Sequence, residues 1–314
     1  MIKVRIRLPS RRVRRIFTRG VRLAPAFALF AAAAAILLGP GRDPDGLPQV
    51  KARCAIVMDA ATGGILYAKN PDLPAYPAST AKILTGLIAA EECDPEEWIT
   101  VGPEIRFAPR DSSRAGLRLG DRIRMEDLIR GLMLPSGNDA AYVLAVRVGR
   151  SRFPGLSPAP KAAVARFVDM MNERARRIGA KQSRFTSPDG YHDSRQVTTA
   201  RDLALIAREA MAHPLFRKIV GSSISIPDPA YRTGRRQAWA WENRNKLLDA
   251  SSPYHYDGST GIKTGHTTEA GYCLASSACR AGRELISIVL NSTEAGVWTD
   301  SAALLDFGFH SAGL

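Results

Sequence analysis

The folded part of the chain opens with an apolar pattern typical of strands. Residues 53–59 and 64–69 are rich in apolar and β-branched side chains, and the AATG segment between them ends in the turn-forming Gly63. This pattern predicts a β-hairpin. No repeat with a period of 20 to 50 residues follows it, which disfavours a solenoid or a propeller.

A helical period begins at residue 79. Within residues 79–92, Ile83, Leu87 and Ile88 fall on one face of a helix that begins with Ser and Thr. This pattern indicates a capped helix with Ser79 at its N-terminus. The middle of the chain keeps this period in four further segments, which are 126–134, 138–149, 161–178 and 200–213. We therefore expect a mostly helical middle.

Short β-rich runs return after residue 221. They are SSISIP (222–227), AWAWEN (238–243), TGIKTG (260–265), GYCLASSA (271–278) and ELISIVLN (284–291), and a helix is expected around residues 300–309. The order of strands, helices, strands and a final helix predicts an α+β fold.

The net charge of +14 is concentrated at one end of the chain. Nine of the fourteen excess positive charges precede residue 23, where no acidic residue opposes them; they are Lys3, Arg5, Arg7, Arg11, Arg12, Arg14, Arg15, Arg19 and Arg22. Five remain for the rest, an ordinary surface balance. Binding to nucleic acid would rest mainly on this tail, and we predict no nucleic-acid partner.

An uncharged apolar run, residues 23–39, follows this basic tail in the layout of an export signal. Its length leaves open both a cleaved signal peptide and an N-terminal membrane anchor. A buried Ala-rich core helix is disfavoured because nine cations would precede it. Positive flanks stay on the cytoplasmic side, so either form predicts an extracytoplasmic domain, secreted or anchored to the cytoplasmic membrane.

These features divide the chain into four parts. The basic tail covers residues 1–22 and the signal or anchor covers residues 23–39. A Gly- and Pro-rich linker is expected over residues 40–50, and one folded domain over residues 51–314.

The four cysteines and five histidines lack the spacing of a metal site. We therefore expect no metal and no cofactor. Cys273 and Cys279 are predicted to share one strand, too far apart to bridge. Together with Cys54 and Cys93 they are interpreted as small apolar filler.

Three short motifs carry candidate chemistry: Ser79-Thr80-Ala81-Lys82, Ser136-Gly137-Asn138 and Lys263-Thr264-Gly265. Residues three apart on a helix share a face, so the amine of Lys82 can approach the hydroxyl of Ser79. An amine whose pKa is lowered by burial and by another cation can accept the proton of a serine nucleophile. Alone, such a serine is more often a plain helix cap and such a lysine a solvated side chain.

The other two motifs strengthen the catalytic interpretation. Ser136-Gly137-Asn138 follows Leu134-Pro135 at a helix break, where a loop can project a hydroxyl and an amide into a cleft. Lys263-Thr264-Gly265 ends a predicted strand, where glycine permits close backbone approach and lysine adds a second positive charge. A simple turn and an edge-strand lysine are the alternatives.

In this order and spacing the three motifs resemble the active-site set of penicillin-binding proteins and serine β-lactamases. The sequence around these motifs, such as YPASTAKILTGL and GIKTGHTTEAGYCLASSA, is similar to that of the D-alanyl-D-alanine carboxypeptidase group. The similarity runs from Arg53 to Phe309. It implies an antiparallel five-stranded sheet flanked by helices, a mostly helical subdomain, and an active site between them. It also implies penicillin-sensitive removal of the terminal D-alanine from peptidoglycan stem peptides.

The resemblance also implies roles for the motif residues. Ser79 would be the acylated nucleophile, Lys82 its general base in both half-reactions, and Ser136 a proton relay to the leaving amine. The backbone amides of Ser79 and His266 would form the oxyanion hole.

The remaining motif residues would bind the substrate. Asn138 would hold the peptide backbone, Thr264 the terminal carboxylate, and Gly265 would admit the ligand to the strand. Lys263 would set the electrostatics of the site.

Two departures from the group limit this transfer. Many relatives place a carboxylate-binding arginine after the penultimate strand region, where this sequence reads NSTEAGVWTDS and has no arginine after Arg283. Carboxylate recognition would then fall to Thr264, Thr267 or another residue. Many relatives also continue into a β-rich domain with a membrane helix, so we expect any membrane attachment through the N-terminal segment.

Other functions share some of these features. A class A-like β-lactamase is disfavoured because no Glu-x-x-Leu-Asn loop lies between Asn138 and Lys263, and SGN stands in place of SDN. A DD-endopeptidase would use the same motifs. A non-catalytic peptidoglycan-binding module is disfavoured by the intact Ser79, Lys82 and Ser136.

Overall fold

The computed structural model describes residues 46–153, 158–226, 230–232, 235–237 and 240–311. The predicted basic tail, the apolar segment 23–39 and residues 40–45 of the predicted linker lie outside these ranges. Residues 47–314 form one compact unit. Among the helices described, none is long and apolar enough to cross a membrane.

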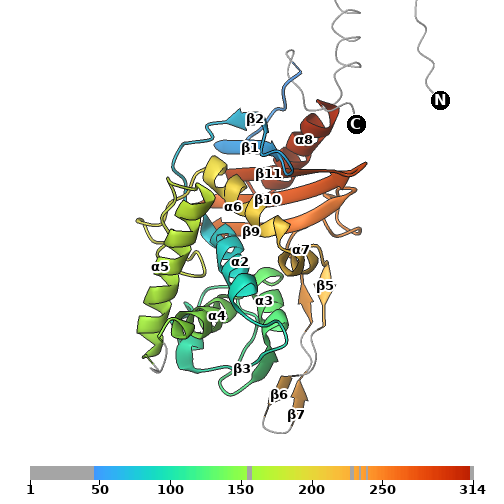
Figure 1. Ribbon diagram of the computed structural model, residues 1–314. Coiled ribbons are helices and arrows are strands. Elements are labelled where there is room, and N and C mark those ends of the chain that lie inside the picture. Colours follow the sequence, from blue (N-terminus) through green and yellow to red (C-terminus); the bar gives the residue numbers. More distant parts are fainter. Residues whose placement is uncertain (1–45, 154–157, 227–229, 233–234, 238–239, 312–314) are drawn as a thin grey trace, which may run out of the picture. The chain divides into compact units, whose positions relative to one another are not determined.

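The sheet has five antiparallel strands in the order β2-β1-β11-β10-β9 (Figure 1). The predicted hairpin is present as β1 (Cys54–Asp59) and β2 (Ile65–Lys69). The three long strands near the C-terminus are β9 (Ser259–Thr267), β10 (Gly271–Arg280) and β11 (Arg283–Ser292). Because β1 pairs with β11, the first strand lies inside the sheet and β9 forms an edge.

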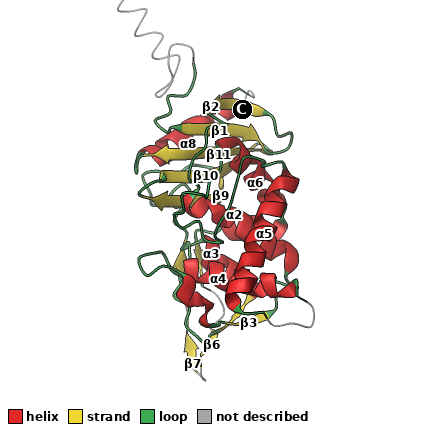
Figure 2. Ribbon diagram, turned by 90° about the vertical axis from the view of Figure 1, so that its left-hand side faces the viewer, coloured by secondary structure: helices red, strands yellow, loops and turns green. Residues whose placement is uncertain are grey.

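Alternate side chains of the central strands enter two separate cores, as a period of two requires. Ala55 and Val57 of β1 pack with the apolar face of α8 (Gly296–His310). Ile56 and Met58 point the other way, toward helices that include α6 (Ala200–Ala212). Figure 2 shows α8 and α6 on opposite sides of the sheet. This confirms the predicted α+β fold with helices on both faces.

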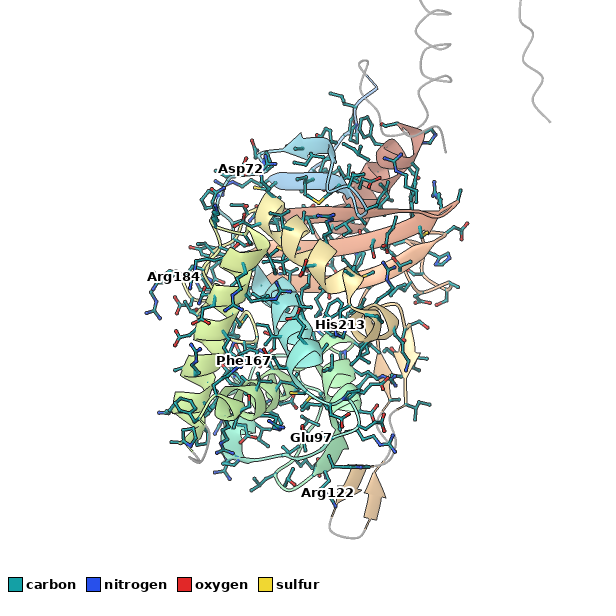
Figure 3. All side chains as sticks on the ribbon, viewed as in Figure 1. Asp72, Glu97, Arg122, Phe167, Arg184 and His213 are labelled. Atoms are coloured by element: carbon teal, nitrogen blue, oxygen red, sulfur yellow. The ribbon has the colours of Figure 1, made fainter. Side chains whose placement is uncertain are left out.

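The helical region lies beside the edge strand β9 (Figure 1). Its helices are α2 (Lys82–Glu92), α3 (Met125–Met133), α4 (Asn138–Ser151), α5 (Pro160–Ile178) and α7 (Pro214–Val220). Helix α2 is central, with every residue from Lys82 to Ala90 buried. Phe167 of α5 is fully buried among these helices, whereas Asp72 and Arg184 lie exposed at the periphery (Figure 3).

The predicted serine cap of α2 is wrong. A 3-10 turn, η1 (Ala78–Ala81), precedes the helix, and neither start has a side-chain cap. The hydroxyl of Thr80 donates to the carbonyl oxygen of Pro77, and that of Ser79 accepts a hydrogen bond from Lys82. The serine hydroxyl is therefore directed at the lysine instead of at the helix amides.

The sequence missed several short elements. They are α7, the 3-10 turn η2 (Pro103–Phe107), and the paired strands β3 (Trp98–Thr100) and β4 (Arg122–Arg124). Strands β6 (Ala230–Arg232) and β7 (Arg235–Gln237) form a further hairpin. Each is too short for a hydrophobic period to develop.

The predicted strands at 222–227 and 238–243 shrink to β5 (Ile224–Ser225) and β8 (Trp241–Glu242), which pair with each other outside the main sheet. Trp241 is buried, and its indole Nε1 donates to the carbonyl oxygen of Ala115 at 2.9 Å. This bond ties the segment after β7 to the loop before α3.

All four cysteines are free. Cys54 and Cys273 are buried, as expected of small apolar filler, and Cys273 and Cys279 share β10 as predicted. The interpretation as apolar filler is wrong for Cys279, which is exposed near the end of β10.

Candidate active site

The three sequence motifs meet in one cleft between the edge of the sheet and the helical region. Its volume is about 960 Å³. The lining includes Ser79 from η1, Ser136 and Asn138 from the turn between α3 and α4, and Thr264 and Gly265 from β9. Positions 79, 136 and 264, far apart in sequence, are thus brought together by the fold.

Ser79 and Lys82 form a direct hydrogen bond. The amine Nζ of Lys82 lies 2.9 Å from the hydroxyl Oγ of Ser79 and donates to the carbonyl oxygen of Asp189 at 2.6 Å. Lys82 is fully buried. Its burial, partly opposed by the carboxylate of Asp189 and assisted by the charge of Arg244, lowers the pKa of Lys82 to about 8. About a tenth of the amine is then neutral at pH 7 and can accept a proton from Ser79.

Ser136 and Asn138 present unpaired polar atoms to the cleft. Both residues are buried, and within the described chain neither Oγ of Ser136 nor Oδ1 of Asn138 has a hydrogen-bond partner. Their backbone is fixed, since the hydroxyl of Ser113 donates to the carbonyl oxygen of Ser136 and the amide of Asn138 donates to that of Ser113. Buried polar atoms in a rigid turn that face a cleft are suited to bind a ligand.

Gly137 is required by this turn. A Cβ at this position would lie 2.6 Å from the carbonyl oxygen of Gly131 and 2.8 Å from the amide nitrogen of Ala115. The middle residue of the motif therefore serves packing, while its two neighbours face the cleft.

Lys263 and Gly265 occupy the edge strand. Lys263 is buried and its Nζ donates to the carbonyl oxygen of Thr264 at 3.1 Å. Burial and the nearby charges of Lys82 and Arg244 hold the pKa of Lys263 well below its usual value. A Cβ on Gly265 would come within 3.1 Å of the amide nitrogen of Ser79. The sequence predicts close approach of a ligand at this glycine, and the structure places the turn that carries the serine there instead.

The loop at residues 187–191, which the sequence did not predict as part of the site, lies against Lys82. Thr85 of α2 donates to the carbonyl oxygen of Pro188, next to the Asp189 carbonyl that binds Lys82. Gly190 has φ +77°, and a Cβ there would lie 2.0 Å from the carbonyl oxygen of Ala78. The Pro-Asp-Gly sequence is a turn signal, but only the fold places it on Lys82.

Asp139 organises a second wall of the cleft. Its carboxylate accepts hydrogen bonds from the backbone amides of Ala115, Gly116 and Leu117 at 2.7 to 3.0 Å. These bonds hold the segment that carries Ser113. The sequence offered no signal for this role beyond a carboxylate next to the second motif.

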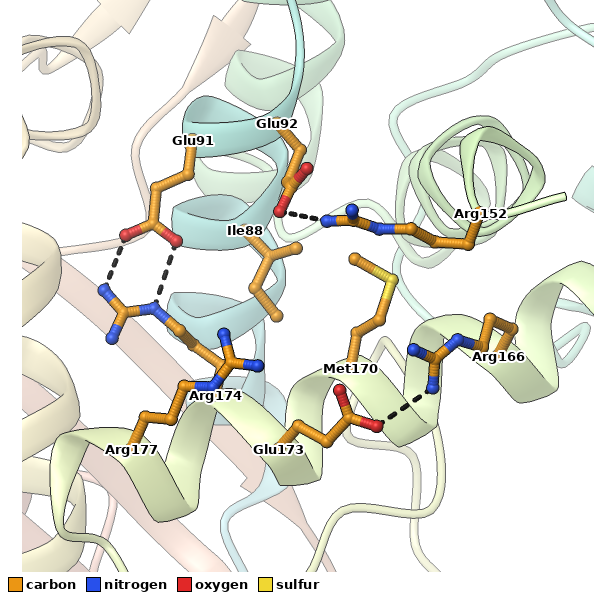
Figure 4. A pocket seen from close by; sticks show the side chains of 9 residues that line it. All are labelled: Ile88, Glu91, Glu92, Arg152, Arg166, Met170, Glu173, Arg174 and Arg177. Carbon is orange, nitrogen blue, oxygen red and sulfur yellow. Dashed lines mark hydrogen bonds and ion pairs between the residues drawn. The ribbon is translucent and has the colours of Figure 1, made fainter. Parts of the chain in front are cut away.

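A second cavity, of about 180 Å³, lies between α2, α4 and α5 (Figure 4). Glu91 is paired with Arg174, Glu92 with Arg152, and Glu173 with Arg166. Among its lining residues there is no serine, cysteine or histidine. The first two pairs join the C-terminal end of α2 to its neighbours, the third lies within α5, and none offers a catalytic group. Nor do three or more His, Cys, Asp or Glu gather as a metal-binding group within the ranges that the structure describes.

Comparisons with known proteins agree with this geometry. The family model described as D-alanyl-D-alanine carboxypeptidase matches residues 42–294. A D-alanyl-D-alanine carboxypeptidase of Streptomyces sp. strain K15 is 33% identical over 268 residues, covering 83% of this chain and 88% of that protein. A Haemophilus influenzae relative, D-alanyl-D-alanine carboxypeptidase DacA, is 31% identical, and the match covers 83% of this chain and 63% of that protein.

Solved structures match as well. The crystal structure of the Streptomyces K15 DD-transpeptidase has a TM-score of 0.77 at 32% identity and covers 84% of this chain and 99% of that one. The D-alanyl-D-alanine carboxypeptidase DacD from Francisella tularensis has a TM-score of 0.71 at 27% identity, covering 83% and 70% of the two chains.

Proposed function

The chain belongs to the D-alanyl-D-alanine carboxypeptidase family, and on this premise we propose how its cleft performs the reaction. It is a serine-type D-Ala-D-Ala carboxypeptidase, a hydrolase of the penicillin-binding protein group that acts on peptidoglycan peptides and binds β-lactams. The observation that carries the proposed mechanism is the 2.9 Å contact between the fully buried amine of Lys82 and the hydroxyl of Ser79.

Acylation starts with Lys82 in its neutral form. Its Nζ takes the hydroxyl proton of Ser79 as Oγ attacks the carbonyl carbon of the penultimate D-alanine. The negative charge on the carbonyl oxygen is stabilised by the amides of Ser79 and His266. The peptide C–N bond then breaks, and the proton passes from Lys82 through the hydroxyl of Ser136 to the leaving amine of the terminal D-alanine.

Deacylation returns the enzyme to its starting state. Lys82, neutral again, accepts a proton from a water molecule that attacks the ester carbonyl. The bond between the acyl carbon and Oγ of Ser79 breaks, and the proton returns to that oxygen. The stem peptide leaves one residue shorter.

Substrate binding uses the remaining motif residues. The side-chain amide of Asn138 binds the peptide backbone: its unpaired Oδ1 accepts a hydrogen bond and its Nδ2 donates one. Gly265 on the edge strand lets the turn that carries Ser79 approach β9 closely. Thr264 donates its hydroxyl to the terminal carboxylate, and Lys263 sets the electrostatics around Lys82 and Ser136.

The β-lactam ring opens through the same attack by Ser79. Because the leaving amine stays attached to the ring-opened inhibitor, it remains in the cleft and hinders water. We expect a long-lived ester, in keeping with the absence of a Glu-x-x-Leu-Asn loop.

We also propose that the catalytic domain acts outside the cytoplasm. Support comes from the sequence, where a basic tail and the uncharged run 23–39 precede the folded unit. The domain is secreted if that run is cleaved, or attached to the cytoplasmic membrane if it is retained. Fractionation of cells that express the full chain, with immunodetection of the mature N-terminus, tests this placement.

A single incubation tests the catalytic proposal. The full chain is mixed with a D-Ala-D-Ala-terminated pentapeptide and, separately, with benzylpenicillin, and D-alanine release and protein mass are followed. We expect D-alanine release and a stable adduct that maps to Ser79, both absent in Ser79→Ala. Rapid penicillin turnover without D-alanine release would instead indicate a β-lactamase, and inertness of the wild-type protein a binding module.

The same assay resolves the fate of the acyl group. The similar Streptomyces K15 protein of known structure is described as a DD-transpeptidase, and transfer to an amine differs from hydrolysis only in the nucleophile that attacks the ester. Addition of glycylglycine separates the two: hydrolysis gives the tetrapeptide alone, and transfer gives a new peptide product. A cross-linked dimer of stem peptides, supplied as substrate, reports endopeptidase activity.

A further inference from the structure

Acylation requires a positive charge to form at a fully buried position. When Lys82 takes the proton of Ser79, its amine becomes an ammonium group inside the protein. Its two hydrogen-bond partners in the described chain are neutral, namely the hydroxyl oxygen of Ser79 and the carbonyl oxygen of Asp189. A buried charge is costly unless an opposite charge lies close to it. The reaction therefore needs a negative charge near Lys82.

The side chain of Asp189 is buried beside this amine. Asp189 is fully buried, and its own carbonyl oxygen accepts the hydrogen bond from Lys82 at 2.6 Å. Its carboxylate Oδ1 accepts hydrogen bonds from the hydroxyl of Ser187 at 2.7 Å and from the amide of Tyr191 at 3.1 Å. The side chain of Gln196 accepts a further bond from the amide of Ser187 at 3.2 Å. These bonds fix the turn, and with it the carbonyl group that holds Lys82.

The turn by itself does not account for a carboxylate at this position. A single acceptor oxygen closes the turn, and Oδ2 of Asp189 has no hydrogen-bond partner in the described chain. An asparagine side chain, which is neutral, offers the same acceptor oxygen. A buried charged oxygen without a partner is unfavourable unless a nearby charge compensates it. The charge of Asp189 therefore has to act on a neighbouring group.

Lys82 is the cation on which this charge acts. Burial lowers the pKa of Lys82, and the carboxylate of Asp189 is the largest effect in the opposite direction. From the facing helix α4, Tyr142 also senses the carboxylate, since burial and then Asp189 raise the pKa of its phenol. A phenol with a raised pKa stays neutral and cannot compensate a carboxylate. The amine of Lys82 can do so once it is protonated.

The other charged groups nearby do not serve this purpose. The carboxylate of Asp139 on α4 also raises the pKa of the catalytic amine, but it is engaged by three backbone amides of residues 115–117. Arg244 and, on β9, Lys263 carry positive charge when protonated. On the loop itself, the exposed Tyr191 donates to the carboxylate of Asp111. Asp189 is thus the best placed counter-charge among the described residues.

We propose that Asp189 is a positioning residue for acylation: its carboxylate closes the turn that holds Lys82 against Ser79 and is the counter-ion of the ammonium group that forms there. This assignment rests on the proposed function of Ser79 and Lys82. The proton moves from Oγ of Ser79 to Nζ of Lys82 and on to the leaving amine, and Asp189 takes no part in its transfer.

The test is the pH profile of benzylpenicillin acylation, followed by stopped-flow kinetics, in wild type and Asp189→Asn. Asparagine keeps the turn acceptor and removes the charge. Without the carboxylate the pKa of Lys82 falls below its value of about 8, so the midpoint of the profile should move to lower pH by about one unit or more. The plateau rate at high pH should fall roughly tenfold, because the ammonium group loses its counter-ion and the amine becomes a weaker base. The two effects oppose each other at low pH, so most of the loss should appear above about pH 8.

Two further variants of the same loop separate charge from shape. Ser187→Ala loosens the turn and keeps the carboxylate, so it should lower the rate by a similar factor at every pH and leave the midpoint in place. Asp193→Asn removes a negative charge that is paired with the exposed Arg195. It should change neither the midpoint nor the plateau.

An unchanged midpoint in Asp189→Asn, with a rate loss of equal size at every pH, would overturn the proposal, because the shape of the turn alone would then matter. Unchanged kinetics in this variant, or an equal midpoint shift in Asp193→Asn, would overturn it as well.

NMR spectroscopy of isotope-labelled wild type gives a reading that does not depend on the folding of any variant. The side-chain carboxyl resonance of Asp189 should shift as Lys82 titrates near pH 8. A resonance that does not respond in this range contradicts the counter-ion assignment. A wild-type protein that forms no penicillin adduct contradicts the proposed function instead.

Discussion

At the scale of residues, the cleft depends on two buried lysines in one electrostatic environment. Burying an ammonium group disfavours its charged form, and a second cation nearby adds to the effect. Lys82 and Lys263 satisfy both conditions, with Arg244 adjacent to both. The fold thereby converts a side chain that is normally protonated into a base.

The pH dependence of acylation follows from this. Below about pH 8, the pKa of Lys82, the fraction of neutral amine falls roughly tenfold per pH unit. The rate of benzylpenicillin acylation should rise with pH up to about 8 and level off above it, as followed by stopped-flow kinetics. A rate that falls as pH rises through this range would contradict Lys82 as the base.

The lowered pKa of Lys82 also makes the free energy of unfolding depend on pH. Because the pKa of Lys82 is lower in the folded state than in the unfolded state, the unfolded chain binds more protons between about pH 8 and 10.5. The contribution of Lys82 to stability therefore increases with pH across this window and is lost as pH falls through it. The isosteric change Lys82→Met, which removes the buried charge, should flatten this dependence in urea unfolding at several pH values while abolishing acylation.

Ser136 offers a separation of function from stability. Its buried hydroxyl has no partner in the described chain, so Ser136→Ala removes an unsatisfied group and should change the free energy of unfolding by less than about 0.5 kcal/mol. Loss of the proton relay should slow acylation roughly 100- to 1000-fold. Denaturant unfolding and penicillin acylation are the measurements, and the control is Ser259→Ala, since the hydroxyl of Ser259 is also buried without a partner in the described chain but does not line the cleft. A large stability change would contradict a purely functional role.

At the scale of elements, the site is held by contacts between turns that no single helix or strand provides. The start of α2 carries the serine and the lysine, β9 approaches it at Gly265, and the loop at residues 187–191 covers the lysine. Glycines at these crossings let backbones approach more closely than any side chain would allow.

Gly190→Ala tests this assembly. The added Cβ would lie 2.0 Å from the carbonyl oxygen of Ala78, at a φ of +77° that disfavours alanine. It should lower the free energy of unfolding by about 2–4 kcal/mol and reduce acylation by displacing Asp189 from Lys82. Gly282→Ala is the matched control, with φ +79° and open space around the Cβ. It should cost about 1 kcal/mol and leave acylation intact.

At the scale of the whole molecule, residues 47–314 form one compact unit with two cores on the two faces of one sheet. The active cleft lies between the sheet and the helical region, and the ion pairs of Figure 4 tie α2 to α4 and α5 behind it. A protein without residues 1–46 should therefore keep its thermal unfolding midpoint and its penicillin acylation rate. Loss of cooperative unfolding on this deletion would contradict the domain boundary.

The elements with a long hydrophobic period and the local chemistry of the motifs can be predicted from the sequence alone. The β1–β2 hairpin, helices α3 to α6 and strands β9 to β11 all repeat apolar residues often enough to be read from the chain. Ser79 and Lys82 are three positions apart, so their contact follows from local geometry. The order and spacing of the three motifs indicated the family, because the residues of all three motifs act in one active site.

The groups that reach the cleft from distant parts of the chain could be located only in the folded structure. The carbonyl of Asp189, the turn at Ser113 and the guanidinium group of Arg244 carry no motif of their own. The order of the strands and the exclusion of β5 and β8 from the main sheet follow from packing that has no local signature. Burial lowers the pKa of Lys82, and burial is a property of the whole fold because it requires α2 to be covered on every side.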